Sequence, residues 1–349
     1  NAQNPVILAG NGVVRSHASR QLCEFADRLN IPVANTFMAK GVIPFGHRCA
    51  LGSAGLHSTD YVGCGFDRAD VIICVGYDLV EYHPYLWHPD RDRKIIHIDH
   101  SPAEVDAHYP VAVGVTGDIK LSLERIAKQA SPHEGKHIRP LRERLVEEMN
   151  QHRDDLEFPV KPQNIIWDLR TALALEDIVV CDVGAHKMWM ARMFRCEHPN
   201  TCIISNGFAS MGIAVPGAIA ARLAEPRRNV VAVTGDAGFM MNSQEIETAI
   251  RNRVNIVILI WNDSSYGLIE WKQMNQFRRT SNVRFNNPDF IKYAESFGAA
   301  GYRVKRTSDL PTILEEALDY DGVSIIDCPV DYRENIKLTE QLGTLVCPT

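Results

Sequence analysis

Two aspartates follow two short apolar runs of the chain, at a spacing that suits one shared site. Asp236 comes soon after the β-branched run Val230–Val233, and Asp263 comes 27 positions later, after the run Asn255–Trp261. Short apolar runs that end in small or polar residues are typical of buried strands. A helical crossover of this length would make the strands parallel neighbours. Both carboxylates would then lie at the sheet edge where open α/β folds bind ligands.

The turn after the first of these strands is built from small residues. Thr234–Gly238 permits a tight turn and leaves backbone N–H groups open to a ligand. We expect a helix to follow, with Asn242 and Glu245 forming a capping box at its start. Hard oxygen donors beside open amides suit a diphosphate held through Mg²⁺. Either aspartate alone could cap a turn or a helix, whereas both at this spacing favour a metal site.

These motifs resemble those of a known family. Gly235-Asp236-Ala237 followed by Asn262-Asp263 is similar to the Gly-Asp-Gly and Asn-Asn signature of thiamine-diphosphate enzymes, with alanine in place of the third glycine. Some acetolactate-synthase-like members share this alanine. The segments SNGFASMGIAVPGAIAARL, YAESFGAAGYRV and CPVDYRENIKL resemble the catabolic, FAD-independent acetolactate synthases. The resemblance covers nearly the whole chain, from Asn4 to about Leu342.

The resemblance implies an enzyme, a transferase or lyase, that decarboxylates pyruvate or a related 2-keto acid and condenses it with a second pyruvate to 2-acetolactate. It implies thiamine diphosphate and Mg²⁺ as cofactors, with Asp236, Asp263 and the backbone carbonyl of Ser265 as metal ligands. It gives Met211 a steric role, which is to bend the cofactor into a V. The residues that it implies in cofactor binding are Gly184, Ala185, His186, Gly207, Met211, Gly235, Asp236, Ala237, Gly238, Asp263, Tyr266, Gly267 and Leu268.

The resemblance also implies residues and partners outside this chain. The family bonds the cofactor's aminopyrimidine ring through a glutamate of an N-terminal domain, which the neighbouring subunit contributes. This chain contains no such segment before its central domain, so we expect the chain by itself to be inactive. The family works as homodimers or homotetramers with the site between subunits.

Apolar runs alternate with helical patterns along the chain, which predicts an α/β fold with two doubly wound parallel-sheet domains. We expect a central domain over residues 1–130 and, by resemblance, a thiamine-diphosphate-binding domain over 162–349. Between them we expect a charged linker over 131–161, with a solvated helix at Leu141–Asn150. The expected helices include 16–29, 211–223 with Pro216 starting or kinking it, and 308–318 with Ser308 as its N-cap.

The first strand, Pro5–Ala9, ends in Gly10-Asn11-Gly12, which invites comparison with a dinucleotide-binding motif. Arg15 stands where the third glycine of that motif belongs, so we expect no NAD at this turn. By resemblance, this domain carries FAD in the biosynthetic relatives, which have an Arg-Phe-Asp-Asp-Arg run after the strand Val71–Val75. Gly76–Tyr82 stands there instead, so we expect no FAD either.

Composition narrows the class of protein. The formal net charge is −6 and no basic stripe with interleaved aromatics occurs, which argues against nucleic acid as a partner. No apolar run reaches the ~18 residues of a membrane helix, and no secretory signal opens the chain. We therefore expect no membrane partner and a cytoplasmic location. The nine cysteines include no C-x-x-C pair, which argues against a zinc or redox motif.

Two alternative functions remain open. Another thiamine-diphosphate enzyme of 2-keto acids, such as pyruvate oxidase or a decarboxylase, would share the same motifs, although the stretch CPVDYREN over residues 328–335 favours acetolactate synthase. A non-catalytic nucleotide-binding module would keep the α/β scaffold and lose the chemistry. Binding of Mg²⁺ and thiamine diphosphate separates this last reading from the other two.

Overall fold

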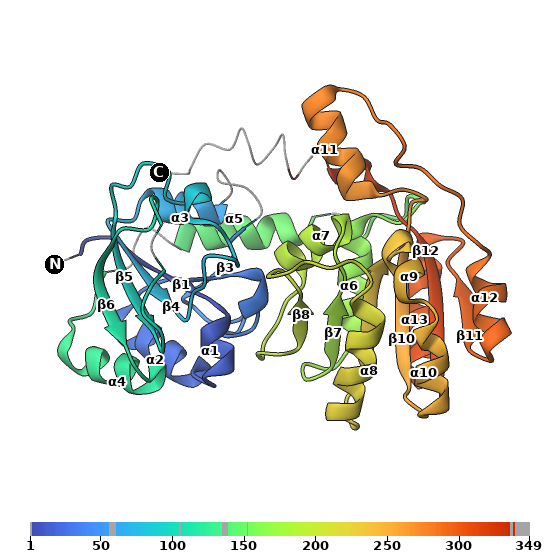
Figure 1. The fold of residues 1–349 in the computed structure, drawn as a ribbon, viewed down its shortest axis with the longest axis horizontal. Coiled ribbons are helices and arrows are strands. Elements are labelled where there is room, and N and C mark those ends of the chain that lie inside the picture. The colour runs from blue at the N-terminus through green and yellow to red at the C-terminus, as the bar shows by residue number, and fades with distance from the viewer. Residues whose placement is uncertain are drawn as a thin grey trace. The chain divides into compact units, whose positions relative to one another are not determined.

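The computed structural model describes residues 2–55, 61–104, 106–134, 139–151, 153–335 and 338, which form two compact units (Figure 1). Within these ranges, unit 1 comprises residues 2–150, Cys196–Asn200 and Leu338, and unit 2 comprises Gln151–Arg195 and Thr201–Asn335. Each unit is built around its own six-stranded parallel sheet. Among the helices of these ranges, none combines the length and the apolar character that a membrane span requires.

Unit 1 is a sheet covered by helices on both faces. Its strands are β1 (Pro5–Ala9), β2 (Val33–Asn35), β3 (Ala50–Ser53), β4 (Val71–Val75), β5 (Lys94–Asp99) and β6 (Val111–Thr116), and its helices are α1 (Asn11–Arg15), α2 (Ser19–Leu29), α3 (Tyr61–Asp67), α4 (Ile119–Gln129) and α5 (Arg139–Met149). The strand order is β3-β2-β1-β4-β5-β6. Alternate residues of β1 face opposite sides: Ile7 packs in one core with α2 and α4, and Leu8 packs in the other with α3 and α5.

Helix α5 belongs to the core of unit 1, so the expected solvated helix is wrong. Leu141, Leu145 and Met149 stand four residues apart and are at most 5% exposed. The Arg142 guanidinium donates to the carbonyl of Ala50 at 2.6 Å, which ties the helix to β3. The charged residues that suggested a linker occupy the outer face, while the apolar stripe at helical spacing packs inward.

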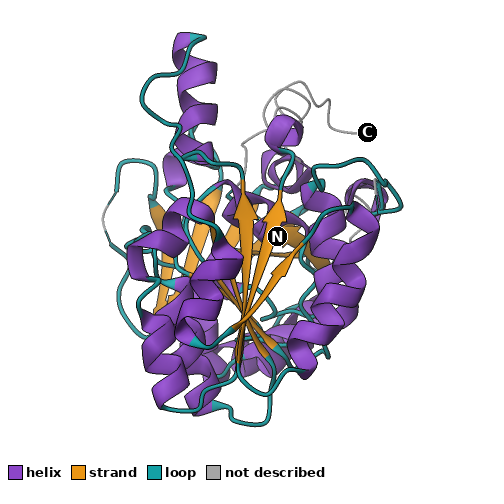
Figure 2. Cartoon of the chain, turned by 90° about the vertical axis from the view of Figure 1, so that its right-hand side faces the viewer, coloured by secondary structure: helices purple, strands orange, loops and turns teal. Residues whose placement is uncertain are grey.

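Unit 2 has the same doubly wound layering, and the strands lie between helices in Figure 2. Its strands are β7 (Ile178–Cys181), β8 (Cys202–Ile204), β9 (Val230–Gly235), β10 (Ile256–Asn262), β11 (Ala300–Arg303) and β12 (Val323–Pro329), in the order β11-β12-β10-β9-β7-β8. Its helices are α6 (Pro162–Ala172), α7 (Ala185–Met193), α8 (Ala214–Ala224), α9 (Asp236–Asn242), α10 (Glu245–Arg251), α11 (Gly267–Phe277), α12 (Phe290–Phe297) and α13 (Leu310–Asp319). The predicted α/β class with two doubly wound parallel sheets is confirmed.

Three expected helix starts are wrong, and a backbone feature explains each. The segment 16–29 forms α2 only from Ser19, because His17 adopts a left-handed φ of 50° after α1. The segment from 211 remains a loop up to Ala214, because Gly212 adopts a φ of +88°. Helix α13 begins at Leu310 after a 3-10 turn, so Ser308 is not its N-cap.

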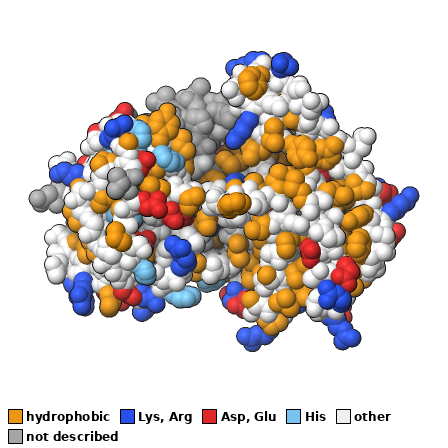
Figure 3. Space-filling view, viewed as in Figure 1, with side chains coloured by type: hydrophobic (Ala, Val, Ile, Leu, Met, Phe, Trp, Pro, Cys, Tyr) orange, Lys and Arg blue, Asp and Glu red, His pale blue; other side chains and the backbone are white. Residues whose placement is uncertain are grey.

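On the face that Figure 3 shows, Lys and Arg side chains are scattered among apolar and acidic ones. They form no continuous stripe on that face. This distribution agrees with the negative formal charge of the chain, which is −6.

Candidate functional site

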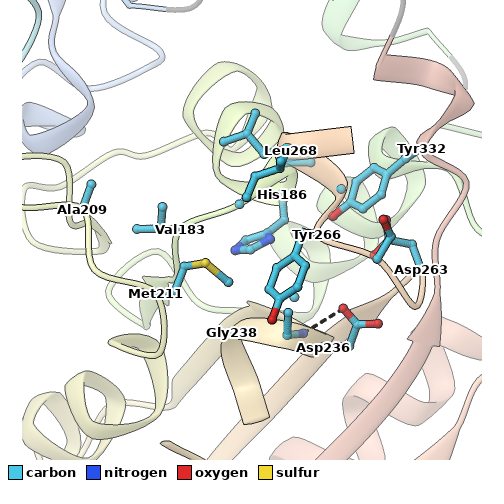
Figure 4. Close-up of a pocket in the computed structure, with 17 residues that line it drawn as sticks. Val183, His186, Ala209, Met211, Asp236, Gly238, Asp263, Tyr266, Leu268 and Tyr332 are labelled. Atoms are coloured by element: carbon cyan, nitrogen blue, oxygen red, sulfur yellow. Dashed lines mark hydrogen bonds between the residues drawn. The ribbon is translucent and has the colours of Figure 1, made fainter. Parts of the chain in front are cut away.

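The carboxyl ends of three neighbouring strands of unit 2 enclose a cavity of about 230 Å³ (Figure 4). The strands are β7, β9 and β10, and the direction of the connections reverses between β7 and β9. Such a reversal is where open α/β sheets bind ligands. The cavity is lined by Val183, Gly184, Ala185, His186, Ala209, Met211, Gly235, Asp236, Ala237, Gly238, Asp263, Ser265, Tyr266, Gly267, Leu268, Ile269 and Tyr332.

Asp236 is the first residue of α9 and is 1% exposed. Its Oδ1 accepts from the backbone N–H of Ala237 at 2.8 Å, and its Oδ2 accepts from the N–H of Ser264 at 2.7 Å and from Asn287 Nδ2 at 2.6 Å. Burial raises the pKa of Asp236, and these hydrogen bonds act against that rise. The carboxylate therefore joins the end of β9 to the turn after β10.

Asp263 directly follows β10 and lies close to Asp236. Burial and then the charge of Asp236 raise the pKa of Asp263 to about 8. Helix α11 begins tightly against this carboxylate, since a Cβ at Gly267 would lie 2.7 Å from Asp263 Oδ2. Two carboxylates in a shielded site repel each other, and a divalent cation between them would relieve that repulsion.

The turn after β10 is held by backbone pairing with the segment 283–285. The carbonyl of Ser264 accepts from the N–H of Phe285 at 3.1 Å, and the N–H of Tyr266 donates to the carbonyl of Val283 at 2.9 Å. The Ser265 hydroxyl donates to Glu270 Oε2 at 2.7 Å. The side chain of Ser265 is thus engaged away from the cavity, so any contact of Ser265 with a ligand falls to its backbone.

Two buried polar atoms in the cavity wall have no hydrogen-bond partner within the described ranges: His186 Nε2 and the Tyr332 hydroxyl. Burial lowers the pKa of His186 to about 3, so its ring is neutral. Burial and then the charges of Asp263 and Asp236 raise the pKa of Tyr332, so its phenol stays protonated. A buried polar group without a partner costs roughly 1–3 kcal/mol, which a polar ligand in the cavity would offset.

Comparison with known proteins shows the family to which the chain belongs. Residues 1–126 match the central domain of the thiamine pyrophosphate enzymes, and residues 182–328 match their C-terminal TPP binding domain. The chain belongs to the thiamine pyrophosphate enzymes. It is 35% identical over 99% of its length to the acetolactate synthase of Bacillus subtilis, and 32% identical over 98% to the catabolic acetolactate synthase of Raoultella terrigena. It is also 34% identical over 99% to a probable acetolactate synthase large subunit of Methanocaldococcus jannaschii.

The chain spans about three-fifths of the length of these relatives: 62% of the first two and 60% of the third. Thiamine pyrophosphate is the same compound as thiamine diphosphate.

The cavity of this thiamine pyrophosphate enzyme fits the cofactor of the family. Asp236 and Asp263 offer the hard oxygen ligands that Mg²⁺ prefers, and His186 and Tyr332 offer unpaired polar atoms to a polar group. Gly184 precedes α7 and lets the imidazole fold back, since a Cβ there would lie 2.6 Å from His186 Cε1. Thiamine diphosphate has an anionic diphosphate and flat aromatic rings, which suit a wall that carries both polar and apolar side chains.

Met211 reaches the cavity from a loop that two other side chains hold in place. Asp182 Oδ1 accepts from the N–H of Gly212 at 2.9 Å, and Asn242 Nδ2 donates to the carbonyl of Gly212 at 2.9 Å. A side chain does not fit at Gly212, because a Cβ would lie 2.7 Å from Asn242 Nδ2. The expected capping box of Asn242 and Glu245 is wrong, since Asn242 ends α9 and its amide bonds this loop.

The predicted cofactor-binding residues all line the cavity except Gly207, which lies in the loop after β8 and is not part of the wall. The motifs did not single out Tyr332, although it stands in the stretch CPVDYREN. The motifs also missed Asn287 and Asp182, which is the residue directly after β7. No signal marks Asn287, because its loop is brought to Asp236 by tertiary folding alone.

Proposed function

We propose that this chain is the central and cofactor-binding portion of an acetolactate synthase that depends on thiamine diphosphate. Its substrate would be pyruvate, which is decarboxylated and condensed with a second pyruvate to 2-acetolactate. The observation that carries the proposal is the pair Asp236 and Asp263 at neighbouring strand ends, with raised pKa values, in a cavity with unpaired polar atoms. The names of the relatives from Bacillus subtilis and Raoultella terrigena support this reaction.

In this proposal, Asp236, Asp263 and the backbone carbonyl of Ser265 bind Mg²⁺. The two glycine-containing helix starts, 184–186 and 235–238, would hold the diphosphate through backbone N–H groups and His186. These residues neutralise and orient the anionic end of the cofactor.

The apolar part of the wall has a different task in this proposal. Met211 supports the bent form of the cofactor, and Tyr266, Gly267 and Leu268 cover the cofactor beside it. The cofactor, when bound, supplies the electron sink that decarboxylation requires. The protein residues hold its reactive end in one orientation and keep water away from it.

We further propose that the activity of the whole protein needs residues outside this chain. The relatives are longer than the matched region, and the family contributes a glutamate from an N-terminal domain of a neighbouring subunit. This chain alone would then bind Mg²⁺ and thiamine diphosphate weakly and turn over no pyruvate. The active form would be a homodimer or homotetramer that does not use FAD.

A product assay on the full-length gene product tests the reaction. With pyruvate, Mg²⁺ and thiamine diphosphate we expect acetolactate, and we expect none from the Asp236→Ala variant. Acetaldehyde or acetyl phosphate as the main product would favour a decarboxylase or a pyruvate oxidase instead. A wild-type protein that binds neither Mg²⁺ nor thiamine diphosphate in calorimetry would be a non-catalytic module.

A further inference from the structure

Tyr332 reaches the cavity from a fourth strand end, that of β12. It is the first residue of the 3-10 turn Tyr332–Glu334. In Figure 4 the ring points its hydroxyl toward the middle of the cavity, on the side of His186. The ring lies near the acidic pair, since a Cβ at Gly267 would lie 3.4 Å from Tyr332 Cδ2 and 2.7 Å from Asp263 Oδ2. The hydroxyl is therefore part of the wall beside the carboxylates.

The segment that carries Tyr332 is anchored on both sides. Before it, the N–H of Asp331 donates to the carbonyl of Val160 at 2.9 Å. After it, Trp189 Nε1 donates to Asn335 Oδ1 at 2.7 Å. The ring also packs near Trp261, with centroids 6.3 Å apart. These contacts hold the ring without using its hydroxyl, so the hydroxyl is held in position to bind a ligand.

The chemistry of the Tyr332 hydroxyl limits the kind of group that it can bind. A phenol is protonated at neutral pH, so the buried Tyr332 hydroxyl is a hydrogen-bond donor. Neither Asp236 nor Asp263 accepts its proton, because the hydroxyl has no partner within the described ranges. A donor that lies unpaired beside a candidate cation site suits an anion that arrives together with the cation.

We propose that the Tyr332 hydroxyl donates a hydrogen bond to an anionic oxygen of the diphosphate that enters the cavity with Mg²⁺, an inference that rests on the proposed function. Tyr332 is then a binding residue for the phosphate end of the cofactor. It acts from β12, outside the three strand ends whose motifs mark the family.

The substitution Tyr332→Phe separates binding from packing. It removes only an unpaired hydroxyl, so the melting temperature of the ligand-free full-length protein should stay unchanged or rise. In calorimetric titrations with Mg²⁺ present, the Kd for inorganic pyrophosphate and for thiamine diphosphate should rise about tenfold, which corresponds to about 1.4 kcal/mol. Affinity for thiamine, which has no phosphate, should not change.

Tyr293→Phe is the matched control. The Tyr293 hydroxyl lies 2.8 Å from Ser243 Oγ, and Tyr293 is not part of the cavity wall. This variant should lower the ligand-free melting temperature by roughly 2–4 °C and leave pyrophosphate affinity unchanged.

Two results would overturn the inference. One is an unchanged pyrophosphate Kd in Tyr332→Phe, and the other is a loss of ligand-free stability as large as that of Tyr293→Phe. Failure of the proposed function looks different. In that case the wild-type protein binds pyrophosphate with Mg²⁺ and shows no added affinity for thiamine diphosphate, while the effect of Tyr332→Phe on pyrophosphate persists.

Discussion

The two sheets end differently at the edge where α/β folds bind ligands. In unit 1 the connections reverse between β1 and β4, and α1 begins there. Both carboxylate oxygens of Glu81 accept from the N–H of Asn11 at 3.0 Å, and Oε2 also accepts from the Thr36 hydroxyl at 2.6 Å. The backbones are in close contact, since a Cβ at Gly10 would lie 2.4 Å from the carbonyl oxygen of Gly76. An internal carboxylate therefore already binds the first N–H of α1, which would otherwise be open to a phosphate.

The corresponding edge of unit 2 keeps polar groups that the protein does not satisfy. Burial and the charge of Asp236 raise the pKa of Asp263 to about 8, and His186 Nε2 and the Tyr332 hydroxyl have no partners within the described ranges. Both edges carry small-residue turns after parallel strands, so architecture and glycines alone do not make a ligand site. The difference lies in whether the buried polar groups are satisfied by the protein itself. This comparison supports the proposal that unit 1 takes no FAD.

The largest effect is expected from Asp236→Ala, which removes a candidate metal ligand at the carboxyl edge of the unit 2 sheet. Loss of a metal ligand should weaken Mg²⁺-dependent binding of thiamine diphosphate by about a hundredfold or more, measured by calorimetry. Asp177→Ala is the control, because Asp177 is buried just before β7, at the opposite end of the strand, and accepts from the N–H of Asn229 at 2.8 Å. The control should lose stability and keep its affinity. Equal losses of affinity in both variants would contradict a metal role for Asp236.

The second prediction is that the affinity of unit 2 for Mg²⁺ depends on pH. Asp263 has a pKa of about 8 and must lose its proton to bind Mg²⁺, so affinity should rise about tenfold per pH unit up to pH 8 and then level off.

The ligand-free protein should show the opposite trend in stability. The pKa of Asp263 is higher in the folded than in the unfolded protein, so the free energy of unfolding should fall as pH rises from about 4 to 8. Asp263→Asn should remove this contribution. A Mg²⁺ affinity that does not change between pH 6 and 8 would show that Asp263 is not a ligand.

Glu81→Ala tests whether the Glu81 carboxylate satisfies the backbone at the carboxyl edge of the unit 1 sheet. It leaves the Asn11 N–H and the Thr36 hydroxyl without their acceptor, so unit 1 should lose about 1–3 kcal/mol of stability in denaturant unfolding. Binding of Mg²⁺ and thiamine diphosphate to unit 2 should not change. Glu81→Gln keeps one acceptor oxygen and should cost less. A variant that keeps full stability would show that this carboxylate does not close the edge.

The smallest effect is expected from Asn242→Ala, which frees the carbonyl of Gly212 in the Met211 loop. We expect a loss of about 1 kcal/mol in stability, with a smaller loss in cofactor affinity because the loop is no longer fixed. Asn252→Ala is the control, since its amide makes the same kind of bond to the carbonyl of Thr248 at 2.7 Å on the surface. If both variants behave alike, the Met211 loop does not depend on Asn242.

Local patterns predicted much of this molecule. Apolar runs between helical segments predicted parallel sheets, because the periodicity of a buried strand depends only on neighbouring residues. The 27-residue spacing of Asp236 and Asp263 predicted adjacent strand ends, since one crossover helix connects parallel neighbours. Helix starts were less predictable. Ser308 and Asn242 have good capping side chains, but 3-10 geometry and a bond to Gly212 decided their roles.

The sequence by itself determined the α/β class and the family, since both depend on short-range patterns. Only the tertiary structure decided that Asn287 bonds Asp236, that Tyr332 enters the cavity, and that the glycine turn of unit 1 is closed by Glu81. Each of these contacts joins residues at least 51 positions apart. Packing forms them, and no spacing rule along the chain records which distant side chain will satisfy a buried polar group.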